Sequence, residues 1–274
     1  MIIPTVSQPV RSSNKLPNTP INVTSFNLYR FYVLICNEVL IHIKNLDKTE
    51  RMNTDLLLNM DFSRATCLRP DAQVWVKSPA DGVSRIPLER EAAESGHTTS
   101  FVKFEAGSYF PAHLHPQGEE IYVLEGVFSD ENDDYPAGTY IRNPPGSRHK
   151  PFTKEGCTLF VKLDQFQKGD NKHVAIKPDE QDWRAGFGNL KVSPLHAHNG
   201  ESTALVWWPE KEVFQPHAHD GGEEVVVIKG EFIDEYGAYP AGTWIRSPHM
   251  SKHYPRVDKE TLLLVKVGHL SQNV

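Results

Sequence analysis

The sequence predicts an all-β chain that holds two similar barrels in tandem. Two stretches of the chain, Phe110–His149 and Phe214–His253, repeat one pattern of histidines, glutamates, glycines and prolines. The second copy follows the first at a constant offset of 104 residues without a gap. A repeat of this kind fixes the architecture as two copies of one unit. Long helical periodicity is missing from both copies, which favours strands throughout.

Short segments rich in β-branched and aromatic residues predict the strands of each copy. In the first copy they are Thr98–Phe104, Ile121–Leu124, Thr139–Arg142 and Thr158–Lys162. In the second copy they are Ala204–Trp208, Glu224–Ile228, Thr243–Arg246 and Leu262–Val267. The first-copy segment Ile121–Leu124 is apolar on both faces, as expected where one face lines a barrel and the other meets a second sheet.

Composition narrows the class of protein. With 274 residues and 39% hydrophobic content, the chain is long enough to bury a core. A net charge of −6 and an isoelectric point near 6.1 argue against nucleic acid or an anionic membrane as the main partner. Three widely spaced cysteines, Cys36, Cys67 and Cys157, form no disulfide or thiolate-zinc pattern, which favours a cytoplasmic location.

The chain divides by composition into a leader, two barrels and a linker. Residues 1–51 carry four early prolines and are expected to be a disordered leader outside the fold, or to precede a translation start at Met52. Their apolar stretch is interrupted by charged residues, which argues against a membrane span. Barrel 1 is expected at 52–164, the linker at 165–172 and barrel 2 at 173–274. Each barrel is expected to close with its own strands.

Each copy carries three histidines and a glutamate at spacings that suit one metal ion. The first two histidines of each set are two residues apart, so a strand directs both side chains to one face. Imidazole nitrogen and carboxylate oxygen are ligands for zinc, iron, nickel or manganese. The first set is His113, His115, Glu119 and His149, and the second is His217, His219, Glu223 and His253.

Both copies resemble the cupin signature, G-x5-H-x-H-x3-E-x6-G followed by G-x5-P-x-G-x2-H. The E-x6-G spacing selects Glu119 and Glu223 rather than the glutamates that follow them. The first copy fits throughout, with Gly107 leading the first motif and Gly138, Pro144, Gly146 and His149 forming the second. The second copy departs from the signature at two positions, Lys211 and Met250.

The chain resembles the ChrR-like cupins in particular, from roughly Leu68 to Val267. The resemblance implies two double-stranded β-helix, or jelly-roll, barrels with one divalent metal each, Fe(II) or zinc, held by the two ligand sets. It also implies a metal-dependent dioxygenase acting on a small ketone-like substrate. The metal centre of barrel 1 is favoured for catalysis because Met250 is expected to displace His253 in barrel 2. No catalytic base and no other cofactor are indicated.

Two other functions remain open. ChrR-like cupins also occur in zinc anti-sigma factors, so the chain could be a non-enzymatic zinc-binding sensor of small molecules. The first 60 residues lack the His/Cys cluster that sigma-factor binding would need. A sugar-phosphate isomerase of cupin type is a weaker reading, because no lysine or acidic pair is placed for it. A homodimer formed through edge strands is the default assembly.

Two arginines occupy equivalent positions in the repeat. Arg142 and Arg246 are expected to form ion pairs within their own barrels, with Asp130 and Asp234 as candidate partners.

Other polar and aromatic residues are assigned to the surface or the core. His196 and His198 have no counterparts in the first copy and are expected to be solvated loop residues. Tyr122, Tyr140, Phe152 and Trp244 are expected in the core, because aromatic residues on barrel strands usually pack there.

Overall fold

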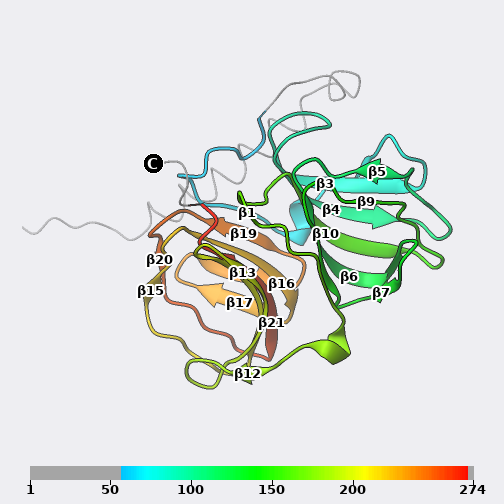
Figure 1. Ribbon diagram of the computed structural model, residues 1–274. Helices are drawn as coiled ribbons and strands as arrows, with labels where there is room; N and C mark the ends of the chain where they lie inside the picture. Colours follow the sequence, from blue (N-terminus) through cyan, green and yellow to red (C-terminus); the bar gives the residue numbers. More distant parts are fainter. Residues whose placement is uncertain (1–56, 271–274) are drawn as a thin grey trace, which may run out of the picture. The chain divides into compact units, whose positions relative to one another are not determined.

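The computed structural model describes residues 57–270, which form two β-barrels and, within this range, no α-helix (Figure 1). The all-β fold class predicted from the sequence is therefore confirmed. The expectations for residues 1–51 lie outside the described residues. No helix in the described part of the chain is long and apolar enough to cross a membrane.

The first barrel is built on an eight-stranded sheet with the order β11-β8-β6-β10-β4-β3-β2 and with β7 paired to β6. A separate two-stranded sheet joins β5 to β9. The strands are β2 (Val76–Lys77), β3 (Val83–Arg90), β4 (Thr98–Phe104), β5 (His113–Leu114), β6 (Glu119–Ser129), β7 (Asp134–Pro136), β8 (Tyr140–Asn143), β9 (Arg148–His149), β10 (Cys157–Leu163) and β11 (Val174–Ile176).

The second barrel repeats this plan. Its main sheet has seven strands in the order β1-β19-β16-β21-β14-β13-β12, and two small sheets pair β15 with β20 and β17 with β18. The strands are β1 (Thr66–Leu68), β12 (Arg184–Ala185), β13 (Lys191–His198), β14 (Glu201–Trp208), β15 (His217–Ala218), β16 (Glu223–Lys229), β17 (Glu231–Asp234), β18 (Gly237–Pro240), β19 (Trp244–Ser247), β20 (Lys252–His253) and β21 (Thr261–Val267).

All eight strand segments expected from the sequence lie in or overlap strands of the structure. The sequence pattern did not predict β3 and β13, and each of these strands contains a proline at a register shift. The shift in β3 follows Pro87, and the shift in β13 follows Pro194. A proline removes a ladder donor and is tolerated at such irregularities, but it also breaks the pattern that marks a strand.

The expectation that each barrel closes with its own strands is wrong, because the two repeats exchange their first strands. β1 precedes barrel 1 in the chain but pairs antiparallel with β19 of the second sheet, and Figure 1 shows the two side by side. β11 follows the linker but pairs antiparallel with β8 of the first sheet. The predicted domain boundaries, which place barrel 1 at 52–164, the linker at 165–172 and barrel 2 at 173–274, stay a prediction.

Matching contacts fix both exchanged segments. A short 3-10 helix, η2 (Pro70–Ala72), follows β1, and Gln73 Nε2 then donates a hydrogen bond of 2.7 Å to the carbonyl oxygen of Gly242. The equivalent helix, η3 (Pro178–Glu180), follows β11, and Gln181 Nε2 donates a hydrogen bond of 2.9 Å to the carbonyl oxygen of Gly138. Each glycine has a positive φ, near 90°, where a side chain would be strained.

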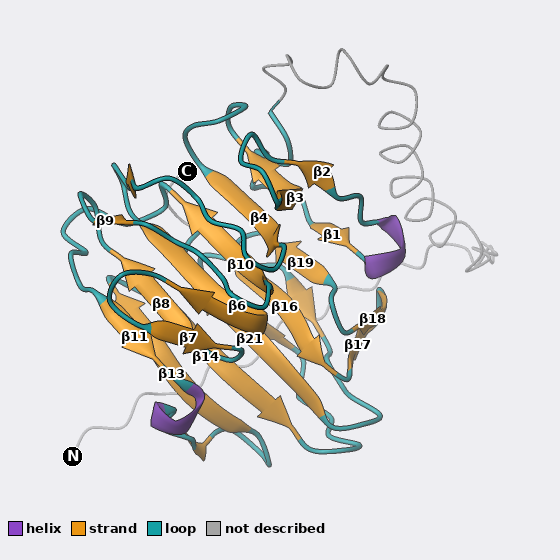
Figure 2. Cartoon of the chain, turned by 90° about the vertical axis from the view of Figure 1, so that its right-hand side faces the viewer, coloured by secondary structure: helices purple, strands orange, loops and turns teal. Residues whose placement is uncertain are grey.

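The two main sheets lie face to face as two layers (Figure 2). Each barrel has an interior apolar core of its own, and a third core lies between the sheets. The expected burial of Tyr122, Tyr140 and Trp244 in this shared core is confirmed, whereas Phe152 is only half-buried. Its buried members are Ile86, Leu88, Phe101, Tyr122, Tyr140, Phe160, Val174, Leu195, Leu205, Val226, Trp244 and Leu264.

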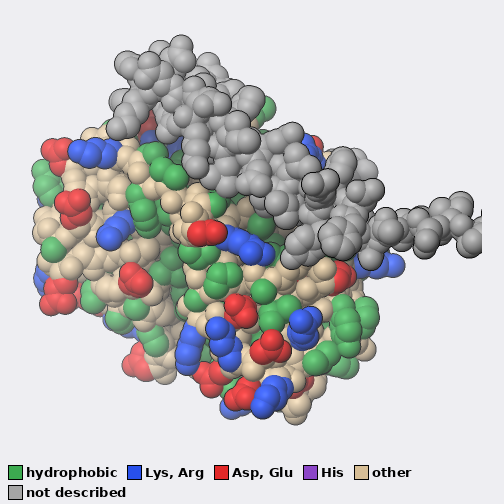
Figure 3. Space-filling view, turned by 180° about the vertical axis from the view of Figure 1, so that it is seen from behind, with side chains coloured by type: hydrophobic (Ala, Val, Ile, Leu, Met, Phe, Trp, Pro, Cys, Tyr) green, Lys and Arg blue, Asp and Glu red, His purple; other side chains and the backbone are tan. Residues whose placement is uncertain are grey.

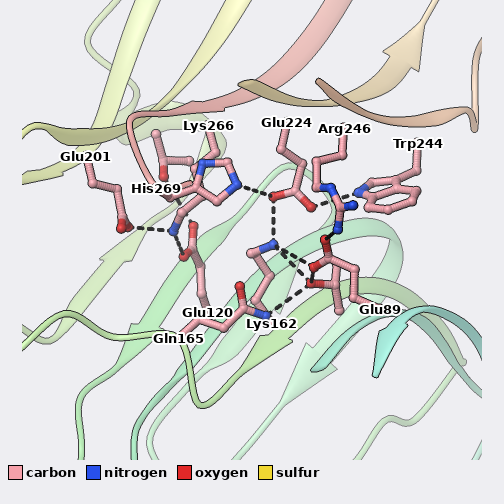
Figure 4. Close-up of polar contacts among 12 residues, drawn as sticks. Glu89, Glu120, Lys162, Gln165, Glu201, Glu224, Trp244, Arg246, Lys266 and His269 are labelled. Atoms are coloured by element: carbon pink, nitrogen blue, oxygen red, sulfur yellow. Dashed lines mark hydrogen bonds and ion pairs between the residues drawn. The ribbon is translucent and has the colours of Figure 1, made fainter. Parts of the chain in front are cut away.

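Two lysine–glutamate ion pairs cross from one barrel to the other inside this shared core. Lys266 Nζ of β21 lies 2.6 Å from Glu120 Oε2 of β6, and Lys162 Nζ of β10 lies 2.6 Å from Glu224 Oε2 of β16 (Figure 4). All four side chains are buried. Each lysine also has the glutamate of its own sheet directly opposite in register. The crossing pairs therefore form a four-residue lock between the barrels, which we call the crossed lock.

Further buried groups surround the crossed lock on the Glu224 side. Trp244 Nε1 donates a hydrogen bond of 2.7 Å to Glu224 Oε1, and Arg246 Nη1 lies 2.5 Å from Glu89 Oε1 of β3 (Figure 4). Burial acts to raise the pKa of Glu89, but the charge of Lys162, the hydrogen bond with His97 and the charge of Arg246 outweigh it, so that pKa is lowered. Glu89 thus links barrel 1 to Arg246 of barrel 2.

On the Glu120 side, an arginine and a histidine extend the same network. Arg142 Nη1 lies 2.9 Å from Glu120 Oε2, and Arg142 Nη2 lies 2.6 Å from Asp170 Oδ2. His196 Nε2 lies 2.8 Å from the same Asp170 oxygen. The expectation that His196 is a solvated loop residue is wrong, because it lies buried on β13 at the barrel interface.

The arginines are structural, but their expected partners were wrong. Arg142 pairs with Glu120 and Asp170 instead of Asp130, and Arg246 pairs with Glu89 instead of Asp234. The reason is that both side chains lie on the sheet face that meets the other barrel. The two aspartates lie on hairpin turns, where each accepts backbone N–H groups.

On the face drawn in Figure 3, acidic and basic side chains are interspersed rather than gathered by sign. This mixed surface accompanies a modest net charge of −6. A closely grouped set of charges also lies in the buried network between the barrels.

Removing β1 should destabilise the second barrel. We expect a chain that starts at Arg69 to be roughly 3 kcal/mol less stable than one that starts at Asp61, because it loses a strand ladder and carbonyl partners of Arg246. Hydrogen exchange measured by mass spectrometry should accelerate most in β19. Faster exchange confined to β8 would contradict the strand exchange.

Breaking one pair of the crossed lock should cost far more than breaking a surface pair. Lys162→Met leaves Glu224 buried without its lysine, so we expect a loss of roughly 3–5 kcal/mol in denaturant unfolding. Adding Glu224→Gln should recover most of that loss. The control is Lys229→Met, which breaks an exposed pair with Glu260 and should cost below about 1 kcal/mol. Equal losses in the two lysine variants would contradict the role of burial.

Candidate metal centres

The first candidate centre lies inside barrel 1, where β5, β6 and β9 bring its four side chains together. His113 and His149 are opposite each other in register on β5 and β9. His115 follows β5, and Glu119 begins β6. One ligand atom from each residue lies within 4.8 Å of every other, so the four could hold a metal ion. The sequence-predicted set is therefore brought together.

Orphaned nitrogen atoms show that this group fits a metal. The Nε2 atoms of His115 and His149 are buried and have no hydrogen-bond partner. Each lies 3.4 Å from Glu119 Oε2. Buried polar atoms are normally satisfied, so two imidazole nitrogens converging on one carboxylate oxygen suit a shared cation.

The chain also fixes the orientation of the first histidine. His113 Nδ1 lies 2.8 Å from the carbonyl oxygen of Pro111, which can only accept a hydrogen bond. The proton therefore resides on Nδ1, and Nε2 keeps its lone pair for a metal. His217 of the second barrel has the same arrangement with the carbonyl oxygen of Gln215 at 3.0 Å.

Two residues that the sequence did not predict support the first centre. Asn143 Nδ2 donates a hydrogen bond of 3.0 Å to Glu119 Oε2. Asp130 Oδ2 lies 3.6 Å from His149 Nδ1, an ion-pair contact longer than a hydrogen bond. Asn143 lies directly opposite Glu119 in register. Only the strand register reveals this contact, and no sequence spacing encodes it.

Burial and nearby carboxylates set the electrostatics of the first centre. Burial lowers the pKa of His115. Burial also acts to lower the pKa of His149, but Asp130 and Glu119 outweigh it, so that pKa is raised. Burial acts to raise the pKa of Asp130, but His149 and two backbone N–H groups outweigh it, so this pKa is lowered.

The second candidate centre lies inside barrel 2. His217 and His253 are opposite in register on β15 and β20, and their Nε2 atoms face each other at 3.1 Å. With His219 they form a group that could hold a metal ion. Glu223 lies at the edge of the group, with Oε1 3.2 Å from His219 Nε2 and Oε2 3.7 Å from His253 Nε2.

The two buried sites differ electrostatically. In the second, burial and then the neighbouring His217 lower the pKa of His219 to about 4 and that of His253 to about 3, with His219 contributing to the second shift. Burial, followed by the charge of Asp234, raises the pKa of Glu223 to about 8. Without a metal, the side chains of His219, Glu223 and His253 are therefore neutral at neutral pH.

The expectation that Met250 displaces His253 is wrong. Met250 adopts a φ of 58°, in the same left-handed region as Gly146 at 83°, and its side chain is exposed. Its backbone N–H donates to the carbonyl oxygen of His219 at 3.0 Å, as Gly146 donates to that of His115 at 2.9 Å. A non-glycine residue can hold this turn at a modest strain.

The first centre opens on the side of His113. This side chain is half-buried, while the other three ligands are buried. A surface groove of about 370 Å³ beside Tyr109, Glu131, Lys150 and Phe152 contains none of the ligand residues. His113 is therefore the most accessible residue of the first centre, and the groove is separate from it.

Two jelly-roll barrels in one chain, each with an interior group of histidines and a glutamate, define a bicupin. The family model described as the ChrR cupin-like domain matches residues 63–167 and again residues 171–271. The chain belongs to this family of ChrR cupin-like domains. A search of curated proteins gave no match.

Solved structures of low sequence identity share the fold. A candidate dioxygenase from Nostoc punctiforme has 15% identity and a TM-score of 0.66, over 77% of this chain and 85% of that one. The bacterial pirin YhhW from Escherichia coli, in complex with nickel(II), has 14% identity and a TM-score of 0.57, over 74% and 98%. Oxalate decarboxylase from Lactobacillus farciminis has 14% identity and a TM-score of 0.53, over 74% and 85%.

The raised pKa of Glu223 predicts how the metal-free protein responds to pH. Between the ordinary glutamate pKa and about pH 8, the unfolded chain releases a proton that the folded chain retains. The free energy of unfolding should therefore fall as pH rises, by at most about 1.4 kcal/mol per pH unit from this group. Glu223→Gln should lack this component, measured as Tm in chelator from pH 5 to 8. Parallel Tm curves for the two proteins would contradict the prediction.

Proposed function

We propose that the protein is a metal-dependent dioxygenase-type oxidoreductase acting on a small ketone-like substrate, with the centre of barrel 1 as its active site. The observation that carries this proposal is the convergence of His113, His115, Glu119 and His149 inside the barrel. Three imidazoles and one carboxylate leave positions open on Fe(II) for dioxygen and a chelating substrate. The fold shared with a candidate dioxygenase is consistent with this class.

In this proposal each set of residues holds one divalent ion. His113, His115, Glu119 and His149 bind one in barrel 1, and His217, His219, Glu223 and His253 bind one in barrel 2. Fe(II) or zinc is the expected metal, and the nickel(II) complex of YhhW shows that a protein of this fold holds a divalent metal. When bound, the metal supplies the redox or Lewis-acid chemistry.

The surrounding residues bind, orient and exclude water. The carbonyl oxygen of Pro111 holds His113 in the tautomer that offers Nε2. Asn143 fixes the carboxylate of Glu119 through one hydrogen bond. Phe110 packs edge-on against His113, with ring centroids 5.0 Å apart, and gives the open side of the centre an apolar wall.

A non-enzymatic zinc sensor is the second candidate. Three histidines and one glutamate also complete a four-coordinate site, which is the usual form of structural zinc. In that case the barrel would bind a small molecule without consuming dioxygen. The sensor would keep its zinc ion fully coordinated and would bind a small molecule, whereas the dioxygenase would consume dioxygen.

Two further expectations belong with the proposal. We place the protein in the cytoplasm, because the cysteines show no disulfide pattern. We also propose a homodimer formed through edge strands such as β2 and β12, which end their sheets. Analytical ultracentrifugation of the metal-loaded protein would test the dimer.

Oxygen uptake tests the proposed activity and its location. We expect protein purified without oxygen and loaded with Fe(II) to consume dioxygen on a panel of β-diketones and hydroxyketones. His149→Ala should lower the rate at least 100-fold, and His253→Ala should lower it by less than threefold, because only the first centre is proposed to react.

Bound metal should be measured on the same samples. Greater loss of activity in His253→Ala would place the reaction in barrel 2. Tight ligand binding without oxygen uptake, on zinc-loaded protein, would support the sensor instead.

A further inference from the structure

We infer that the two metal centres are built to have unequal affinities, and that Asn143 and Asp130 are the positioning residues that make the first centre the tighter one. This inference rests on the proposed metal binding but not on the proposed oxygenase activity. It predicts that the chain holds one metal ion before it holds two.

Asn143 and Ser247 occupy equivalent positions in the two barrels, but their side chains differ in length. Asn143 lies opposite Glu119 in register, and Ser247 lies opposite Glu223 in the same way. The Asn143 amide donates a hydrogen bond of 3.0 Å to Glu119. Within the described residues no hydrogen bond joins the shorter serine side chain to Glu223.

This difference matches the positions of the two carboxylates. Glu119 is held within 4.8 Å of all three histidine ligand atoms, whereas Glu223 falls outside the corresponding group. A hydrogen bond from outside the coordination sphere fixes a carboxylate ligand in place before the metal arrives. The second centre therefore offers three histidines and a carboxylate that must move.

Asp130 and Asp234 show a second difference. Asp130 Oδ1 accepts the N–H groups of Asn132 and Asp133, which leaves Oδ2 to contact His149 Nδ1 at 3.6 Å. Asp234 Oδ1 accepts N–H groups in its own turn at 2.8 Å and 3.0 Å. No ion pair between Asp234 and His253 is present among the described residues.

A carboxylate on the far side of an imidazole orients the ring and increases the basicity of the metal-binding nitrogen. Asp130 Oδ2 faces His149 Nδ1 at ion-pair distance, and Asp234 makes no such contact with His253 within the described residues. The two contacts act on different ligands of the same centre, so their contributions should combine. Both favour metal binding at barrel 1.

The test measures metal affinity at one centre at a time in the full-length protein. His217→Ala with His219→Ala leaves the first centre, and His113→Ala with His115→Ala leaves the second. Zn²⁺ affinity is measured by competition with a chromophoric chelator. The first centre should bind at least ten times more tightly than the second.

Exchange of the paired residues supplies the matched comparison. In the first-centre background, Asn143→Ser should weaken Zn²⁺ binding roughly 10- to 100-fold. In the second-centre background, Ser247→Asn should tighten it, which a purely structural role of Asn143 would not produce. Co²⁺ absorption bands should shift in both variants, because the position of the carboxylate changes.

The two aspartates control for one another. Each holds a hairpin turn through backbone N–H groups, so Asp130→Ala and Asp234→Ala remove the same structural contact. Only Asp130→Ala should weaken the metal centre of its own barrel. Equal effects of the two variants on the metal affinity of their own barrels would show that Asp130 only stabilises its turn, and would overturn its assignment as a positioning residue.

The outcomes separate this inference from the proposed function. Unequal affinities that follow Asn143 and Ser247, without oxygen uptake, would support the inference and contradict the oxygenase. Equal affinities at the two centres, or no response to either exchange, would overturn the inference. Failure of both centres to bind any divalent metal would overturn both.

Discussion

The arrangement of this protein depends on two lysine–glutamate pairs that cross between its barrels. Lys162 and Lys266 each have a glutamate of their own sheet directly opposite, yet each lies 2.6 Å from the glutamate of the other barrel. The crossing pairs form only when the two sheets lie face to face, and a charge that stays buried without its partner is costly, so any other packing of the sheets would lose these contacts. The crossed lock therefore defines how the barrels pack.

The crossed lock and the candidate metal centre of barrel 1 use adjacent residues of one strand. Glu119 points into barrel 1 toward the histidines, and Glu120, the next residue, points toward Lys266 of barrel 2. Because alternate residues of a strand face opposite sides, the adjacent pair serves both faces of one sheet. Glu223 and Glu224 repeat the arrangement. The lock thus holds β6 and β16 at the point where each contributes its carboxylate to a centre.

The repeat allowed the all-β class, the two barrels and the grouping of the first four ligands to be predicted, because spacing alone carries that information. Spacing did not reveal which contacts lie across strands. Asn143 opposite Glu119 and His196 beside Asp170 depend on register and on the packing of one barrel against the other. The prediction that Met250 displaces His253 was wrong, because a non-glycine residue can also adopt the positive φ of this turn. The exchange of β1 and β11 left no local signal, since three-residue strands have too little pattern.

The exchanged strands also have a consequence for the order of events during synthesis on the ribosome. The first sheet cannot gain its outer strand until Val174–Ile176, which lies beyond the end of β10 at Leu163, has emerged. β1 is made near the start of the described chain, but its partner, Trp244–Arg246, emerges much later. Until then the edge of β1 is open to pairing with other chains. A nascent chain paused between the repeats would therefore be the state most in need of a chaperone.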